Sequence, residues 1–104
     1  MLHQRTWAEI DLDALSANLA TVRGLAGADV STMLVLKANA YGHGAVPVAW
    51  HLLRQGVACL GVGDSTEALE LRAAGITAPI LILGAIVAGE LEDVVRGGIL
   101  VTVH

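Results

Sequence analysis

The spacing of hydrophobic residues changes repeatedly along the chain, and each change predicts a different element. Between residues 12 and 22, leucine and valine recur at intervals of three and four, which is typical of one face of a helix. Asp11 is expected to cap this helix because its carboxylate can accept hydrogen bonds from the free amides of a first turn. Before it, residues 6–10 alternate well enough to predict a short strand.

Four further segments are continuous apolar runs, which are typical of strands covered on both faces. Helical spacing returns three times between them, with Pro47 in one first turn and Asp64 followed by Glu67 as the capping-box-like start of another. The expected strands are residues 33–36, 57–62, 80–83 and 99–103, and the expected helices lie around residues 47–54, 64–74 and 89–96.

This alternation predicts an α/β fold of repeated βα units with a parallel sheet. Such a sheet is either doubly wound or part of a (β/α)8 barrel. Four strands cannot close a barrel, and a complete barrel typically has about 250 residues. A barrel protein would therefore be represented here by a piece.

Composition narrows the class of protein. The 104 residues are 55% hydrophobic and 15% charged, which fits one folded domain and excludes a disordered chain. The chain has six basic and ten acidic residues, so its formal net charge is −4. The sequence therefore predicts neither a nucleic-acid partner nor a membrane-surface segment. Cys59 is the only cysteine, which fits a reducing compartment. No pair of histidines has metal-ligand spacing, so no metal site is expected.

Targeting signals are not expected either. The first thirteen residues carry charges and lack an apolar core, unlike a signal peptide. The longest uncharged stretch, residues 73–89, is interrupted by glycines and a proline and falls short of the roughly 20 residues that span a bilayer. We therefore expect a cytoplasmic protein.

Candidate chemistry gathers around Lys37, the only lysine of the chain. It follows a predicted strand, and α/β folds collect catalytic groups at the carboxyl ends of strands. A desolvated lysine amine can lose its proton and form a Schiff base with a carbonyl compound. Tyr41 stands four residues later, in a segment over residues 38–44 that is predicted to be an irregular, glycine-rich loop. On spacing alone, a solvated lysine at a strand end and a tyrosine packed on the surface are the more common interpretations.

The contiguous string Leu36-Lys37-Ala38-Asn39-Ala40-Tyr41-Gly42-His43-Gly44 resembles the cofactor-lysine signature of the alanine racemases, which are fold-type III pyridoxal-phosphate enzymes. Residues 7–15 resemble the opening of that family, and residues 61–84 resemble its next two βα units. The resemblance covers essentially the whole chain. It implies that residues 1–104 are the N-terminal portion of the barrel domain, the first part of an incomplete (β/α)8 TIM-type barrel, with the C-terminal β domain absent.

The resemblance also implies a reaction and a site. Lys37 would hold pyridoxal 5'-phosphate through a Schiff base and act as one catalytic base, and Tyr41 would bind the phosphate. The reaction would be the interconversion of L-alanine and D-alanine, which supplies D-alanine for peptidoglycan. The substrate would be a small amino acid, and the complete protein would be a homodimer.

One departure from the family pattern limits this expectation. The family's second base is a tyrosine from the partner's C-terminal domain, whereas Tyr41 is the only tyrosine here and is already matched to the phosphate. We therefore expect the chain alone to be inactive. A serine or broad-specificity racemase and a non-catalytic pyridoxal-phosphate-binding fragment remain as alternatives.

Overall fold

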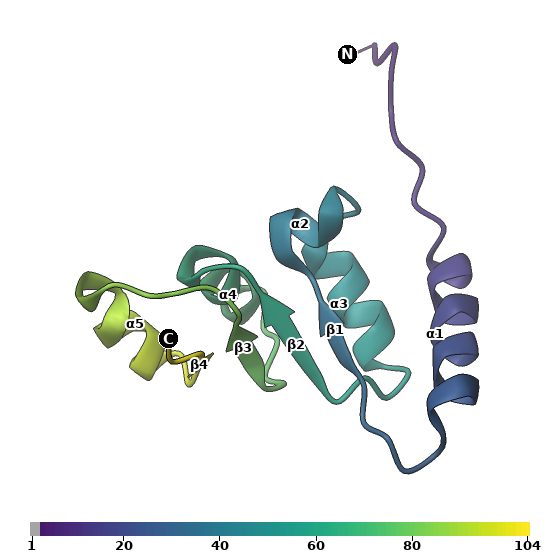
Figure 1. Cartoon of the computed structure of the whole chain (residues 1–104). Coiled ribbons are helices and arrows are strands. Elements are labelled where there is room, and N and C mark those ends of the chain that lie inside the picture. Colours follow the sequence, from purple (N-terminus) through teal and green to yellow (C-terminus); the bar gives the residue numbers. More distant parts are fainter. Residues whose placement is uncertain (1–2) are drawn as a thin grey trace.

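The computed structural model describes residues 3–104 and contains one parallel sheet of four strands in the order β1-β2-β3-β4 (Figure 1). Each strand is connected to the next by helical structure, which confirms the predicted βα repeat. The elements are α1 (Leu12–Ala26), β1 (Met33–Val35), α2 (Lys37–Tyr41), α3 (Ala45–Leu53), β2 (Cys59–Val62), α4 (Ser65–Ala73), β3 (Ile80–Ile82), the 3-10 turn η1 (Ala88–Glu90), α5 (Leu91–Arg96) and β4 (Leu100–Val101).

The register of the sheet places all four carboxyl strand ends along one rim. Leu34 lies opposite Leu60, and Leu60 in turn lies opposite Ile80. The pairing continues from Leu81 to Leu100 on β4. Because the strands are parallel and sequential, residues that follow them, including Lys37, stand at the same rim.

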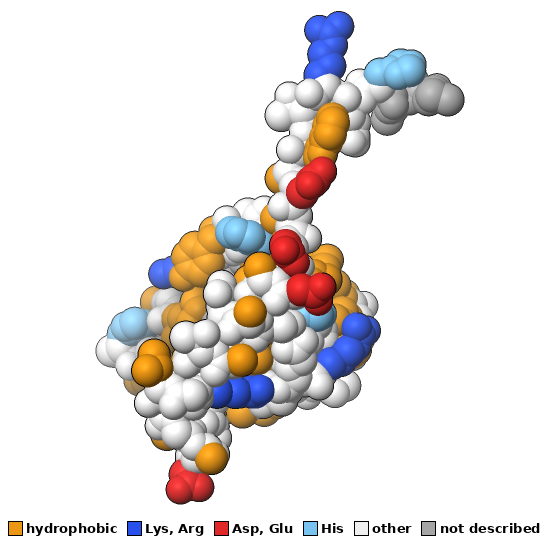
Figure 2. Space-filling model, turned by 90° about the vertical axis from the view of Figure 1, so that its right-hand side faces the viewer, with side chains coloured by type: hydrophobic (Ala, Val, Ile, Leu, Met, Phe, Trp, Pro, Cys, Tyr) orange, Lys and Arg blue, Asp and Glu red, His pale blue; other side chains and the backbone are white. Residues whose placement is uncertain are grey.

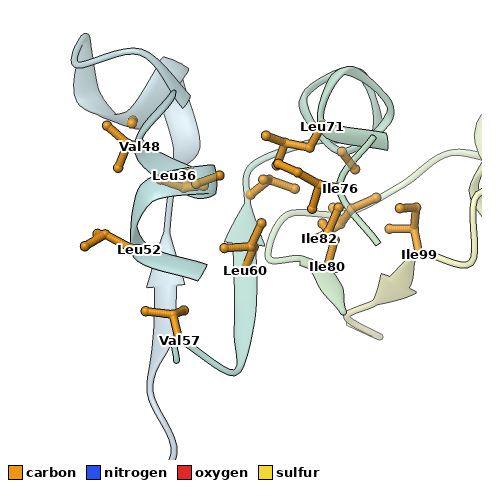
Figure 3. Packing of buried hydrophobic residues seen from close by; sticks show 14 of the residues in the cluster. Leu36, Val48, Leu52, Val57, Leu60, Leu71, Ile76, Ile80, Ile82 and Ile99 are labelled. Atoms are coloured by element: carbon orange, nitrogen blue, oxygen red, sulfur yellow. The ribbon is translucent and has the colours of Figure 1, made fainter. Parts of the chain in front are cut away.

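The core lies between the sheet and the helices on one of its faces (Figure 3). Leu60, Ile80 and Ile82 are fully buried there, together with Leu71 from α4. The other face is open: β1 is only partly buried, and Met33 retains 39% of its exposure. The expectation that every strand is covered on both faces is therefore wrong for this chain, because its helices cover only one face.

The N-terminal segment differs from its prediction. Residues 6–10 are extended but form no strand, and the segment projects away from the body in both views (Figures 1 and 2). A strand needs a neighbour to accept its ladder hydrogen bonds, and the described residues provide none at this place. Trp7 stays 65% exposed. The helix that follows begins as predicted, since Asp11 accepts a hydrogen bond from the Ala14 amide at 3.1 Å.

No helix within residues 3–104 is both long enough and apolar enough to cross a bilayer. In the same range, no three His, Cys, Asp or Glu side chains lie close enough together to hold a metal ion.

Arg72, near the end of α4, joins the two helix-to-strand connections that lead into β3 and β4. Its guanidinium donates to the carbonyls of Ile76 and Ala78 at 3.0 and 2.7 Å. It also donates to those of Gly97 and Gly98 at 2.7 and 3.3 Å. These connections precede strands, so Arg72 stabilises the rim opposite Lys37.

Replacing Arg72 by methionine keeps the aliphatic stem and removes the charged donor. We expect the free energy of unfolding to fall by about 2–3 kcal/mol, because four carbonyls lose a charged partner. Urea denaturation followed by circular dichroism measures the change. Arg54→Met is the matched control: that guanidinium lies 5.9 Å from the Trp50 ring on the surface, and its loss should cost about 0.5–1 kcal/mol. Equal losses in the two variants would contradict the role of Arg72.

Candidate functional site

Lys37 stands directly after β1, at the rim where all four strands end. The residue before it, Leu36, is 1% exposed, and its amide donates to the Gly61 carbonyl of β2 at 2.7 Å. The backbone leading into Lys37 is therefore fixed to the sheet, whereas the Lys37 side chain is exposed. This is the placement that the sequence predicts for Lys37.

The segment after Lys37 is a single turn of left-handed helix. Ala38, Asn39, Ala40 and Tyr41 have φ angles of 52°, 56°, 55° and 55°. This conformation costs about 1–2 kcal/mol for each non-glycine residue. The predicted irregular loop over residues 38–44 is therefore wrong in its first half. Consecutive non-glycine residues in this conformation are uncommon, and strain of this kind concentrates at functional sites.

Local hydrogen bonds and burial offset part of this strain. The amide of Ala40 donates to the Leu36 carbonyl at 2.8 Å, and that of Gly42 donates to the Ala38 carbonyl at 3.0 Å. Ala40 is 6% exposed, so its methyl group joins the core. Gly42 ends the turn with a φ of 86°, a value that only glycine adopts without a steric penalty.

Asn39 connects the left-handed turn to the next helix. Its side-chain oxygen accepts a hydrogen bond from the Ala45 amide, at the start of α3, at 2.8 Å. Its carbonyl accepts from the Gly44 amide at 3.0 Å. Asn39 therefore satisfies a free amide at the start of α3, as an N-cap does from the more usual position.

The turn brings Lys37 and Tyr41 together. The Lys37 Nζ atom lies 6.0 Å from the centre of the Tyr41 ring, and Tyr41 is 58% exposed. In the part of the chain that the structure describes, the one ion pair joins Arg96 and Glu92 at 2.6 Å, so the Lys37 amine is not held by a carboxylate. An amine and a phenol hydroxyl on one short turn suit a ligand that carries both a carbonyl group and an anionic group.

Glu67 has a role at this rim that the sequence did not predict. The expected capping box is half formed, because Asp64 accepts from the Glu67 amide at 2.9 Å. The Glu67 carboxylate, however, accepts from the Ala38 amide at 3.2 Å and from the Gly63 amide at 3.1 Å. It thus joins the carboxyl ends of β1 and β2. Reaching a residue 29 positions away depends on the tertiary fold, which spacing within one helix does not reveal.

Two further contacts organise the rim beyond β2. A Cβ atom on Gly84 would lie 2.6 Å from the Gly63 carbonyl oxygen, so the chain after β3 approaches the chain after β2 at a distance that only glycine permits. The Ser65 hydroxyl donates to the Glu90 carboxylate. This hydrogen bond, with a second from the Val87 amide, lowers the pKa of Glu90 below its ordinary value.

Replacing Asn39 by alanine should destabilise the turn and the start of α3 together. We expect the free energy of unfolding to fall by about 1–2 kcal/mol, because the Ala45 amide loses its acceptor and asparagine tolerates positive φ better than alanine. Chemical denaturation measures the loss. The matched control is Asn18→Ala on the exposed face of α1, where a change within about 0.5 kcal/mol is expected. Equal effects at both positions would contradict the capping role.

The sequence is similar to those of known alanine racemases. Residues 10–104 match the family model described as alanine racemase, N-terminal domain. The chain is 45% identical over 104 residues to the alanine racemase of Methanococcus maripaludis, covering all of this chain and 28% of that protein. It is 54% identical over 82 residues to the alanine racemase of a Nostoc species, covering 79% of this chain and 21% of the relative.

Solved structures agree with these matches. An alanine racemase of Clostridium difficile superposes with a TM-score of 0.95 at 43% identity, covering all of this chain and 27% of that one. An alanine racemase of Bartonella henselae, described with covalently bound pyridoxal phosphate, gives a TM-score of 0.80 at 33% identity, covering 88% and 27%.

The chain thus spans about a quarter of the length of these relatives. The chain with its four parallel strands superposes on part of an alanine racemase structure, as the predicted start of a (β/α) barrel should. The sequence match, the structural match and the arrangement around Lys37 lead to one conclusion: the chain belongs to the alanine racemase family.

Proposed function

We propose that this chain carries the cofactor-lysine part of a pyridoxal-phosphate-dependent alanine racemase. The observation that carries the proposal is the left-handed turn, which presents the Lys37 amine 6.0 Å from the Tyr41 ring at the carboxyl rim of the sheet. The relatives named alanine racemase, and the Bartonella structure with its bound pyridoxal phosphate, support the same cofactor and reaction class.

The two side chains fit the cofactor by their chemistry. The amine of Lys37 would form the covalent link to the cofactor aldehyde, and the hydroxyl of Tyr41 would donate a hydrogen bond to a phosphate oxygen. When bound, pyridoxal phosphate supplies an electron-accepting ring that stabilises the charge left by removal of a Cα proton. The amine of Lys37, once released by an incoming amino acid, would take or return that proton at Cα.

Inversion needs a proton carrier on each face of Cα. Lys37 would serve one face, and Tyr41 is assigned to the phosphate. We therefore propose that residues 1–104 are the N-terminal portion of a barrel domain and bind the cofactor without racemising alanine on their own. The complete enzyme would be a cytoplasmic homodimer that supplies D-alanine for peptidoglycan.

The first test adds pyridoxal phosphate to the chain, traps the covalent adduct with borohydride and maps it by peptide mass spectrometry. We expect one dominant adduct at Lys37, with the α-amine of Met1 as internal competitor and Lys37→Arg as control.

The Tyr41→Phe variant tests the phosphate contact, because it removes only the hydroxyl. It should weaken pyridoxal-phosphate binding about tenfold and leave the binding of pyridoxal, which has no phosphate, unchanged. An adduct confined to Met1, or an equal effect on both compounds, would contradict the assigned roles.

The second arm of this test restores the rest of the enzyme. Residues 1–104 replace the matching part of the Clostridium difficile racemase, with which they superpose at a TM-score of 0.95. We expect the chimera to interconvert the alanine enantiomers and its Lys37→Arg variant to be inactive. Faster turnover of serine would favour the serine or broad-specificity alternative. A Lys37 adduct without turnover would favour the non-catalytic alternative.

A further inference from the structure

The Glu67 carboxylate accepts two hydrogen bonds that are not needed to start α4. Glu67 is the third residue of α4, and its own amide is already capped by Asp64 at 2.9 Å. One oxygen of its carboxylate accepts from Ala38 at 3.2 Å, and the other accepts from Gly63 at 3.1 Å. Both donors are backbone amides at carboxyl strand ends, and Ala38 immediately follows Lys37.

Three residues meet closely at this point. A methyl group on Gly63 would lie 3.2 Å from Glu67 Oε1 and 3.6 Å from Lys37 Cβ. A side chain at position 63 would press on the Glu67 carboxylate, so Gly63 leaves room for that carboxylate beside Lys37. The Ala38 amide that Glu67 holds also belongs to the first residue of the left-handed turn, with φ 52° and ψ 48°.

We infer that Glu67 is a positioning residue for Lys37. Its carboxylate holds the peptide between Lys37 and Ala38 against the end of β2, and so fixes where the chain enters the left-handed turn. That entry point sets the direction of the Lys37 side chain and its placement relative to Tyr41. The inference rests on the proposed function, because it assigns Glu67 to the presentation of the lysine amine to the cofactor.

The chemistry of a carboxylate explains why glutamate suits this position. Two amide donors need two acceptors, and an ionised carboxylate offers one oxygen to each. The amide of glutamine offers one oxygen and one NH2 group, so one donor would face another donor. Aspartate keeps the charge but is shorter by one methylene, so it cannot span the same two amides.

The environment of Glu67 allows the loss of its two hydrogen bonds to be measured in variants that still fold. A cavity of about 300 Å³ lies beside the turn, with Ala38, Asn39, Glu67 and Glu70 in its lining. Water in this space can replace a missing acceptor, so the Glu67 variants should fold while the Ala38 and Gly63 amides become more accessible. Glu70 lines the same cavity one turn later on α4 and is exposed, which makes Glu70→Gln a matched control for charge.

The test compares four variants of the chain: Glu67→Gln, Glu67→Asp, Glu70→Gln and Asp64→Ala. Amide hydrogen exchange at Ala38 and Gly63 reports the two hydrogen bonds without any cofactor. The ratio of borohydride-trapped adduct at Lys37 to that at Met1 reports how well the lysine is presented. Asp64→Ala controls for structure, because it weakens the start of α4 and leaves the Glu67 carboxylate in place.

Both Glu67 variants should accelerate exchange at Ala38 or Gly63 at least tenfold and lower the Lys37-to-Met1 ratio at least tenfold. Glu70→Gln should stay within twofold in both measurements. Asp64→Ala should lower the melting temperature and keep the adduct ratio within twofold. A Glu67 variant with a wild-type adduct ratio, or an Asp64→Ala variant with the same loss of ratio, would overturn the inference.

Failure of the proposed function has a different signature. If the wild-type chain forms no Lys37 adduct, the proposed function of this chain is wrong, and the role of Glu67 in presenting Lys37 is wrong with it. If the wild type forms the adduct and Glu67→Gln forms it equally well, only the inference is wrong. In the chimera, Glu67→Gln should reduce the rate of racemisation at least tenfold, whereas Glu70→Gln should not.

Discussion

Four consecutive residues in the left-handed conformation control the geometry of the rim. Without the turn over Ala38–Tyr41, Lys37 and Tyr41 would not be presented together from a single strand end. The turn is costly in backbone free energy, so it persists only where surrounding contacts determine it. Those contacts come from three sources: the buried methyl of Ala40, the side chain of Asn39 and the carboxylate of Glu67. The turn therefore depends on contacts with both α3 and α4.

The sheet supplies the fixed frame for this turn. Its parallel register brings the ends of β1, β2 and β3 to one rim, and Gly84 allows the chain after β3 to pass close to the Gly63 carbonyl after β2. At the opposite rim, Arg72 ties down the connections that lead into β3 and β4. The two rims use different chemistry, since one is held by a cation that binds carbonyls and the other by an anion that binds amides.

Much of the architecture could be predicted from sequence because it depends on local signals. Helical spacing and the Asp11 and Asp64 caps located α1 and α4, and apolar runs located the strands. The extended segment over residues 6–10 could not be predicted correctly, because alternation alone does not provide a neighbouring strand. The left-handed turn had no local signal, since its first four residues after Lys37 include no glycine. The sequence predicts only a capping role for Glu67, because its acceptor role joins segments that are distant in sequence.

The separation of Ala38 and Glu67 along the chain affects the order in which the site folds. Synthesis proceeds from the N-terminus, so Ala38 leaves the ribosome well before Glu67, 29 residues further along the chain. Until the first turn of α4 has docked at the end of β2, the Ala38 amide lacks the carboxylate that accepts its hydrogen bond. In that state a right-handed or extended conformation after Lys37 has a lower backbone free energy than the left-handed turn. Lys37 and the turn after it therefore reach the arrangement seen in the structure only after the second βα unit has folded.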